Sequence, residues 1–135
     1  MQIGAQSSLV MTSAVSLSAW IYPIGAGSNA TYGGTIVVKE GEYVIARFPN
    51  GTIQWGFANT SPGWQFIDTG YVAPLNQWTH IAVTYDNGTI KTYANGALVH
   101  TYNGSGSIGD AITGQNDFRI GGRSGYLTVL SRANR

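Results

Sequence analysis

Three Asn-Gly dipeptides lie eight residues apart in this chain, at Asn87-Gly88, Asn95-Gly96 and Asn103-Gly104. A two-residue hairpin turn requires positive φ at both of its residues, which asparagine and glycine adopt most readily. The six residues between successive dipeptides are enough for one ordinary strand. Residues 78–104 are therefore expected to form an antiparallel meander, and Asn50-Gly51 predicts a further hairpin upstream.

These turns also predict which side chains share a face, because side chains alternate along a strand. In the meander, the expected core face carries Ile81, Val83, Tyr85, Ile90, Thr92, Ala94, Ala97, Val99 and Thr101. The reverse face is expected to align Thr84, Lys91 and His100 in one row. A two-residue loop at Asn50-Gly51 would place in the core Val44, Ala46, Phe48, Ile53, Trp55 and Phe57. The solvent-facing side of that hairpin would then carry Tyr43, Ile45, Arg47, Thr52 and Gln54.

The rest of the chain repeats this pattern of short alternating segments and turn residues, with further strands expected near Asp117–Gly121 and Tyr126–Leu130. No apolar pattern at helical spacing persists for ten residues, so the fold class is all-β, with two antiparallel sheets packed as a β-sandwich. Residues 1–135 fit one domain, and no linker is visible. The 19 glycines suit a domain with many tight turns.

Composition excludes several function classes. Charged residues make up 10 % of the chain and the net charge is +1, without the basic cluster that nucleic-acid binding requires. There is no cysteine, hence no disulfide framework or thiolate metal site. Residues 1–27 lack the features of a signal peptide, and no segment has the ~20 apolar residues needed to span a membrane.

Four segments have a recognisable sequence pattern: SLSAWIYP (16–23), residues 33–57, PLNQWTHIAVTYDNGTIKTYANGALV (74–99) and FRIGGR (118–123). They resemble laminin-G-like domains of the concanavalin A-like jelly-roll type, which are common in bacterial extracellular proteins. The resemblance implies a jelly roll, an extracellular or cell-surface location, and structural roles for Trp20 and Trp78 at framework positions.

Both ends depart from the family pattern, so the chain resembles a shortened version of the fold. The strand that normally precedes residues 16–23 is expected to be trimmed. At the other end, residues 129–133 resemble only the tail of the usual last strand, and Tyr126, Leu127 and Thr128 replace its acidic pair. Trimming would leave a sheet edge less covered, and such an edge invites pairing with another chain. We therefore expect a homodimer or a partner protein at that edge.

Glycoside hydrolysis by a retaining mechanism needs two carboxyls about 5 Å apart. The only close acidic residues are Glu40 and Glu42, and Gly41 between them predicts a hairpin turn with both side chains in water. His80 and His100 form no convincing dyad or metal pair, and no GxSxG motif is present. The sequence therefore predicts a protein that is not an enzyme, with a vestigial glycosidase as the least favoured reading.

Calcium is the one metal to consider, because many members of the resembled family bind it in rim loops. Ca²⁺ takes six to eight oxygen ligands. Asp110 and Asp117 flank a long loop together with Asn116, and Asp68 lies in another loop. The missing acidic pair near the C-terminus weakens the case. We expect no cofactor, with calcium at these residues as the alternative.

Sugar binding is the leading functional hypothesis. It requires exposed aromatic side chains beside polar groups, and Trp55 fails this test because its register places it in the core. Trp64 lies in a polar loop segment with Asn59, and Asp68 and Tyr71 follow; it is either a sugar platform or a rim residue that covers the core. A second candidate for the sugar site is the row of Tyr43, Arg47 and Gln54, which is expected to point outward. The alternative interpretation is that this row is an ordinary solvated face.

The sequence thus predicts a non-catalytic carbohydrate-binding, lectin-like module. The alternative is a structural or adhesive module that binds a protein partner through a sheet edge.

Overall fold

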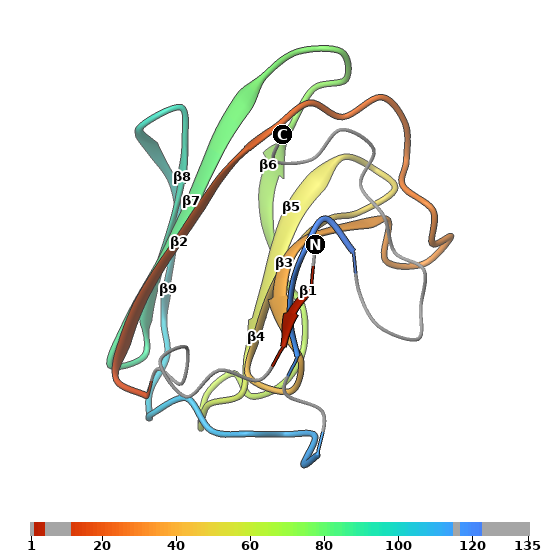
Figure 1. The fold of residues 1–135 in the computed structure, drawn as a ribbon. Coiled ribbons are helices and arrows are strands. Elements are labelled where there is room, and N and C mark those ends of the chain that lie inside the picture. The colour runs from red at the N-terminus through yellow and green to blue at the C-terminus, as the bar shows by residue number, and fades with distance from the viewer. Residues whose placement is uncertain (1, 5–11, 115–116, 123–135) are drawn as a thin grey trace.

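The computed structural model describes residues 2–4, 12–114 and 117–122, which form two antiparallel β-sheets facing each other (Figure 1). The strands of the six-stranded sheet, in spatial order, are β1 (Gln2–Gly4), β10 (Phe118–Ile120), β3 (Gly34–Lys39), β4 (Tyr43–Arg47), β5 (Thr52–Phe57) and β6 (Ile67–Val72). The four-stranded sheet contains β2 (Ala14–Ile21), β7 (Thr79–Asp86), β8 (Thr89–Ala94) and β9 (Ala97–Asn103). The predicted β-sandwich is confirmed. None of the described residues forms a helix long and apolar enough to cross a membrane.

The Asn-Gly turns set the register of the meander as predicted at its first hairpin. Asn87 and Gly88 both have positive φ, and Ile81, Val83 and Tyr85 pair with Ala94, Thr92 and Ile90. The second hairpin begins as predicted, with Ala94 opposite Ala97, but a β-bulge beyond Tyr93 then adds one residue to β9.

The bulge changes the expected rows of the second hairpin. Thr92 pairs with His100 in place of Val99, and Lys91 pairs with Thr101, so the predicted Thr84–Lys91–His100 row is wrong. The third dipeptide ends β9 without starting another hairpin: Gly104 donates its N–H to the carbonyl of Gly88 at 2.8 Å.

The β4–β5 hairpin differs from the prediction by one residue. Gly51 donates its N–H to the carbonyl of Phe48 at 2.8 Å, and Arg47 pairs with Ile53. The loop is therefore a three-residue loop, in which Pro49 supplies the φ of a type I turn and Gly51 takes the left-handed position at φ 90°. A shift of one residue exchanges the two faces of a strand, so Tyr43 and Ile45 face the core in place of Val44 and Ala46.

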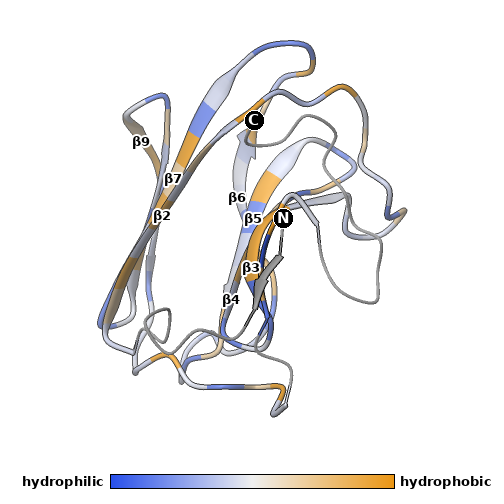
Figure 2. Cartoon of the chain, viewed as in Figure 1, coloured by the Kyte–Doolittle hydropathy of each residue, from blue (hydrophilic) through white to orange (hydrophobic). Residues whose placement is uncertain are grey.

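The core fills the space between the two sheets with aromatic and β-branched side chains. Figure 2 shows hydrophobic residues concentrated on β3, β5 and β7. Phe57 of the six-stranded sheet packs against Tyr85 of the other at a centroid distance of 4.8 Å, and Trp55 packs edge-on against Tyr102 at 5.5 Å. The prediction that Trp55 lies in the core is confirmed, because none of its surface is exposed.

The ends of the fold agree only partly with the expected shortening. The strand expected to be trimmed at the N-terminal side is present as β1, which pairs with β10. The strand predicted near Asp117–Gly121 is confirmed as β10. The strand predicted near Tyr126–Leu130 and the replaced acidic pair lie outside the described residues.

Candidate functional site

The outer face of the six-stranded sheet, turned away from the core, is covered by two loops. One is the β5–β6 loop, residues 58–66, and the other is the Gly-rich loop that precedes β3. Gly56 lets the first loop lie directly on the sheet, because a Cβ at this position would lie 3.0 Å from the carbonyl oxygen of Gln65. Val44, on the same face as Gly56, is buried although it is not part of the core between the sheets.

A pocket of about 390 Å³ lies between these loops and the sheet. Its lining residues are Tyr32, Val44, Phe48, Gly56, Trp64, Gln65, Phe66 and Ile112. Phe48 and Phe66 meet edge to face at 4.8 Å, and Tyr32 lies 5.7 Å from Phe66. The volume is within the range of small-molecule sites, and such sites are lined mainly by apolar and aromatic side chains.

The polar groups of this pocket come from its rim. Gln65 donates its side-chain N–H to the carbonyl of Pro62 at 2.9 Å, which holds its amide in place beside Trp64. Asn29 accepts the backbone N–H groups of Thr31 and Tyr32, which orders the loop segment that carries the Tyr32 ring. None of the eight lining residues is acidic or basic. The pocket therefore suits a neutral ligand with both apolar and hydrogen-bonding surfaces.

Trp64, the first sugar-binding candidate predicted from the sequence, lines this pocket. Asn59 and Tyr71, which were expected to join it, make other contacts. Asn59 donates to the Tyr85 hydroxyl at 3.0 Å and to the carbonyl of Ser61 at 2.8 Å, and its carbonyl accepts the N–H of Gly63. Asn59 therefore anchors the loop and does not face the pocket. Tyr71 packs against the core between the sheets.

Asp68 and Gln54 lie in one cross-strand row with Ala46, on the same face as the pocket. Asp68 is exposed and accepts the N–H of Gly70 at 2.7 Å. Gln54 is buried and donates to the Thr52 hydroxyl at 3.1 Å. These two polar residues stand in the row beside the Val44–Gly56 pair of the pocket floor.

The predicted solvent-facing row of Tyr43, Arg47 and Gln54 is wrong, because of the shifted β4–β5 register. Tyr43 lies in the core against Phe57, and burial, with the nearby Glu42 charge, raises its pKa to about 12. Arg47 is buried and donates to the carbonyls of Ala73 at 2.9 Å and Gly25 at 3.2 Å. Burial lowers the pKa of the Arg47 guanidinium. Neither side chain is positioned to contact a ligand in solvent.

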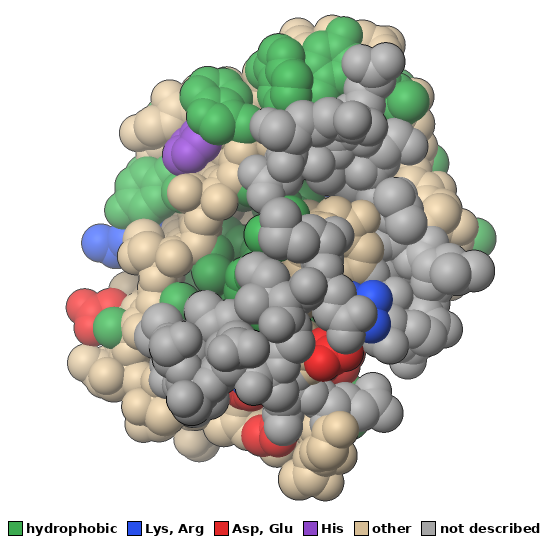
Figure 3. All heavy atoms as spheres, viewed as in Figure 1, with side chains coloured by type: hydrophobic (Ala, Val, Ile, Leu, Met, Phe, Trp, Pro, Cys, Tyr) green, Lys and Arg blue, Asp and Glu red, His purple; other side chains and the backbone are tan. Residues whose placement is uncertain are grey.

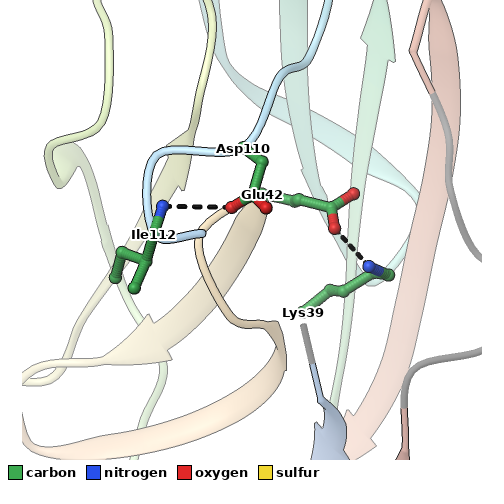
Figure 4. A network of polar contacts seen from close by, with 4 residues as sticks. All are labelled: Lys39, Glu42, Asp110 and Ile112. Atoms are coloured by element: carbon green, nitrogen blue, oxygen red, sulfur yellow. Dashed lines mark hydrogen bonds and ion pairs between the residues drawn. The ribbon is translucent and has the colours of Figure 1, made fainter. Parts of the chain in front are cut away.

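The acidic pair at the β3–β4 turn is structural. The predicted turn is confirmed by Gly41 at φ 81° and by the hydrogen bond from Glu42 N–H to the Lys39 carbonyl at 2.9 Å. The prediction that both carboxylates lie in water is wrong: Glu40 and Glu42 are 4 % and 5 % exposed. Glu42 forms a buried ion pair with Lys39, and Asp110 belongs to the loop that covers this turn (Figure 4).

The aspartate and histidine side chains that were candidates for metal binding or catalysis do not lie together. Asp110 accepts the N–H of Ile112 at 3.0 Å, and Asp117 pairs with Arg119 at 3.5 Å. His80 lies opposite the Asn95 turn as predicted, and His100 lies opposite Thr92. Within the described ranges, no three acidic or histidine side chains gather into a group that could hold a metal ion.

Sequence reasoning missed most of the pocket, since Tyr32, Phe48, Phe66 and Ile112 come from four separate segments. The spacing of Trp64 and Phe66 and the proline before Asn50-Gly51 were the available signals. A proline at this position favours the longer loop that turns Phe48 outward.

Comparison with known proteins identifies the family. The model of the concanavalin A-like lectin/glucanases superfamily matches residues 1–131. The chain belongs to this superfamily. A curated relative, an uncharacterized killer plasmid pGKL-2 helicase of Kluyveromyces lactis, is 43 % identical over 53 residues, which are 39 % of this chain and 9 % of the relative.

Solved structures of similar fold include several proteins described by their sugar ligands. Domain 4 of AbnA, a GH43 extracellular arabinanase from Geobacillus stearothermophilus in complex with arabinotriose, is 25 % identical with a TM-score of 0.63; the match covers 98 % of this chain and 62 % of that one. A putative carbohydrate binding protein from Bacteroides ovatus is 18 % identical, with a TM-score of 0.71 over 98 % of this chain and 39 % of that one. The CBM40 of Ruminococcus gnavus IT-sialidase, bound to α2,3 sialyllactose, is 18 % identical, with a TM-score of 0.60 over 99 % and 83 %. The chain thus spans less than two thirds of the first two structures.

Proposed function

We propose that this chain is a non-catalytic carbohydrate-binding, lectin-like module of extracellular or cell-surface location, which holds a neutral sugar in the aromatic pocket beside Trp64. The observation that carries the proposal is the pocket itself. It joins a loop tryptophan and three further aromatic rings to the Gln65 amide in about 390 Å³. The C–H faces of a sugar ring stack on aromatic rings, while its hydroxyls need polar partners.

Membership of the lectin and glucanase superfamily and the sugar ligands of similar structures support the same reading. The buried state of Glu40 and Glu42 supports a binding role over catalysis. Two carboxylates engaged in a covered turn, one of them paired with Lys39, cannot approach a glycosidic bond as a retaining mechanism requires.

The test is a glycan array probed with the wild-type protein, with and without Ca²⁺, followed by calorimetric titration of the best neutral oligosaccharide. Trp64→Ala should weaken binding at least tenfold. The matched control is Tyr93→Ala, a partly exposed aromatic on the outer face of the other sheet, which should bind like the wild type. Equal affinity of Trp64→Ala and wild type would refute the pocket, and an effect of Ca²⁺ would establish the calcium alternative.

A protein-binding role through a sheet edge is the second candidate, favoured by strand β2. This strand lies at the edge of its sheet and pairs with β7 over all eight of its residues. It contains no proline and no charged residue, the two features that commonly protect an edge from pairing. Sedimentation equilibrium at high protein concentration tests this role, and a monomer without any self-association would count against the homodimer.

A further inference from the structure

One end of the outer face of the four-stranded sheet carries a cluster of ring side chains that the pocket does not use: Trp20, Tyr22, Trp78 and His80, here called the aromatic patch. Trp20 pairs with His80 across β2 and β7, and their rings lie 5.1 Å apart. Tyr22 and Trp78, one step beyond the strand ends, lie 5.3 Å apart. Trp20 and Trp78, which the family resemblance places at framework positions, are 53 % and 48 % exposed, so about half of each side chain is open to a ligand.

The two ring pairs stand on the same face of the sheet. Ile21 and Thr79, which separate them along the two strands, form a pair of their own and are completely buried toward the core. Residues on either side of an inward-facing pair must point outward. The ring pairs are two residues apart along the strands, which is roughly 6.7 Å. This spacing is comparable to the width of a single sugar ring.

The segments that form the aromatic patch are uncharged, and Lys91 on the same outer face lies two cross-strand rows away from the Trp20–His80 pair. Residues 18–24 and 73–82, which carry and flank it, contain no Asp, Glu, Lys or Arg. The loop at its end is held by a hydrogen bond from the N–H of Asn76 to the carbonyl of Pro23 at 2.7 Å, and it exposes the amides of Asn76 and Gln77. Figure 3 shows hydrophobic side chains gathered at the upper end of the molecule, next to a histidine.

We infer that the aromatic patch is a second carbohydrate-binding surface, which takes an extended neutral polysaccharide. Exposed tryptophans supported by neighbouring rings are rigid platforms, and exposed amides beside them supply hydrogen bonds without charge. An open row of exposed, mutually tilted rings suits successive sugars of a chain, whereas the Trp64 pocket between two loops and the sheet suits one sugar or a chain end. The uncharged segments select a neutral polymer over an acidic one, because no cation of residues 18–24 or 73–82 could pair with uronate or sulfate groups.

The inference stands on residues separate from those of the pocket, so the two proposals can fail independently. The experiment is a depletion assay of the full chain against microcrystalline cellulose, insoluble xylan and debranched arabinan, with polygalacturonic acid as the acidic comparison. We expect retention on at least one neutral polymer and none on the acidic one. Trp20→Ala and Trp78→Ala should each weaken retention about tenfold, and the double variant should lose it. Trp20→Phe should restore part of it, since a ring remains.

The control is Val72→Ala, which truncates an equally exposed apolar side chain on the other sheet and should retain the polymer like the wild type. Circular dichroism and the melting temperature establish that each variant is folded. Wild-type protein that binds none of the neutral polymers overturns the inference, as does a folded double variant with unchanged retention. Loss of retention in Trp64→Ala alone would assign the polymer to the pocket. A wild-type dimer in sedimentation that the double variant converts to monomer would assign the aromatic patch to a second copy of the chain.

Discussion

The buried Lys39–Glu42 ion pair offers the sharpest test of the view that the acidic turn stabilises the fold. Its side chains are 1 % and 7 % exposed, so neither charge is solvated by bulk water. Removing one partner leaves an unpaired charge in the interior, which typically costs 3–5 kcal/mol. A domain of this size has about 5–15 kcal/mol of total stability, so Lys39→Met or Glu42→Gln should each remove roughly a fifth or more of it.

The assay is urea unfolding of the wild type, the single variants Lys39→Met, Glu42→Gln and Glu42→Leu, and the Lys39→Met/Glu42→Leu double variant, which closes the cycle with Lys39→Met and Glu42→Leu. Because the double variant replaces both charges by apolar groups of similar size, we expect its stability within about 1–2 kcal/mol of the wild type. The midpoint should fall in the single variants while the slope of free energy against urea stays constant. A coupling of ~3 kcal/mol or more between the two positions is the expected result.

Lys91→Met is the matched control, since it makes the same substitution at a lysine on the outer face of β8. Its effect should be within about 0.5 kcal/mol, as is usual for surface positions. If Lys39→Met and Glu42→Gln were as mild as this control, the pair would be solvated, and the argument that Glu42 is unavailable for catalysis would fail.

Three further predictions concern the core and the loops. Burial raises the pKa of Tyr43 from 10.0 to about 12, so the contribution of Tyr43 to stability is complete below pH 10 and is lost as the pH rises through 12. In urea unfolding, the wild type should therefore lose up to ~1.4 kcal/mol of stability per pH unit in this range because of Tyr43. The Tyr43→Phe variant should lack this part of the pH dependence. Gly51→Ala should cost about 1–2 kcal/mol in the same assay, because residue 51 has φ 90° and its Cβ would lie 2.9 Å from Val72. Asn59→Ala should cost about 1–3 kcal/mol and also weaken sugar binding in calorimetry, because it frees the loop that carries Trp64.

The meander could be predicted from sequence because its registers depend on local turn chemistry. Asn87-Gly88 and Asn95-Gly96 fix their hairpins through positive φ at adjacent residues, and the rows from Ile81 to Tyr85 followed. The bulge in β9, which leaves Val99 as the extra residue between Leu98 and His100, could not be predicted, since no glycine or turn residue marks it.

The β4–β5 error shows how a single residue of register changes a functional assignment. Pro49 favours a type I turn followed by Gly51, so the loop has three residues in place of two. That change moved Tyr43 and Arg47 into the interior and brought Phe48 to the outer face, where the pocket forms. The three-residue loop, and with it the register of β4 and β5, could therefore be predicted from local turn chemistry when Pro49 is taken into account.

Burial of the acidic turn and assembly of the pocket depend on contacts between distant segments. Gly41 accepts the N–H of Ala111 at 2.7 Å, so a loop some seventy residues away in sequence covers Glu40 and Glu42. The outward orientation of Trp20, in contrast, is indicated by the alternation along β2. Trp20 alternates with the buried Ala19 and Ile21 and lies on the same polar side as Ser16 and Ser18.

The central claim is that a sugar binds beside Trp64, and the indole N–H signals of the protein test it directly. The chain has four tryptophans, so a ¹H–¹⁵N spectrum contains four indole signals, which Trp→Phe variants assign. On titration with neutral oligosaccharides, beginning with arabinotriose, the Trp64 signal should shift in a saturable way. The signal of Trp55, buried in the core, should not move. A titration in which a sugar binds and the Trp64 signal stays unchanged would contradict this claim, whether or not the Trp20 or Trp78 signal shifts.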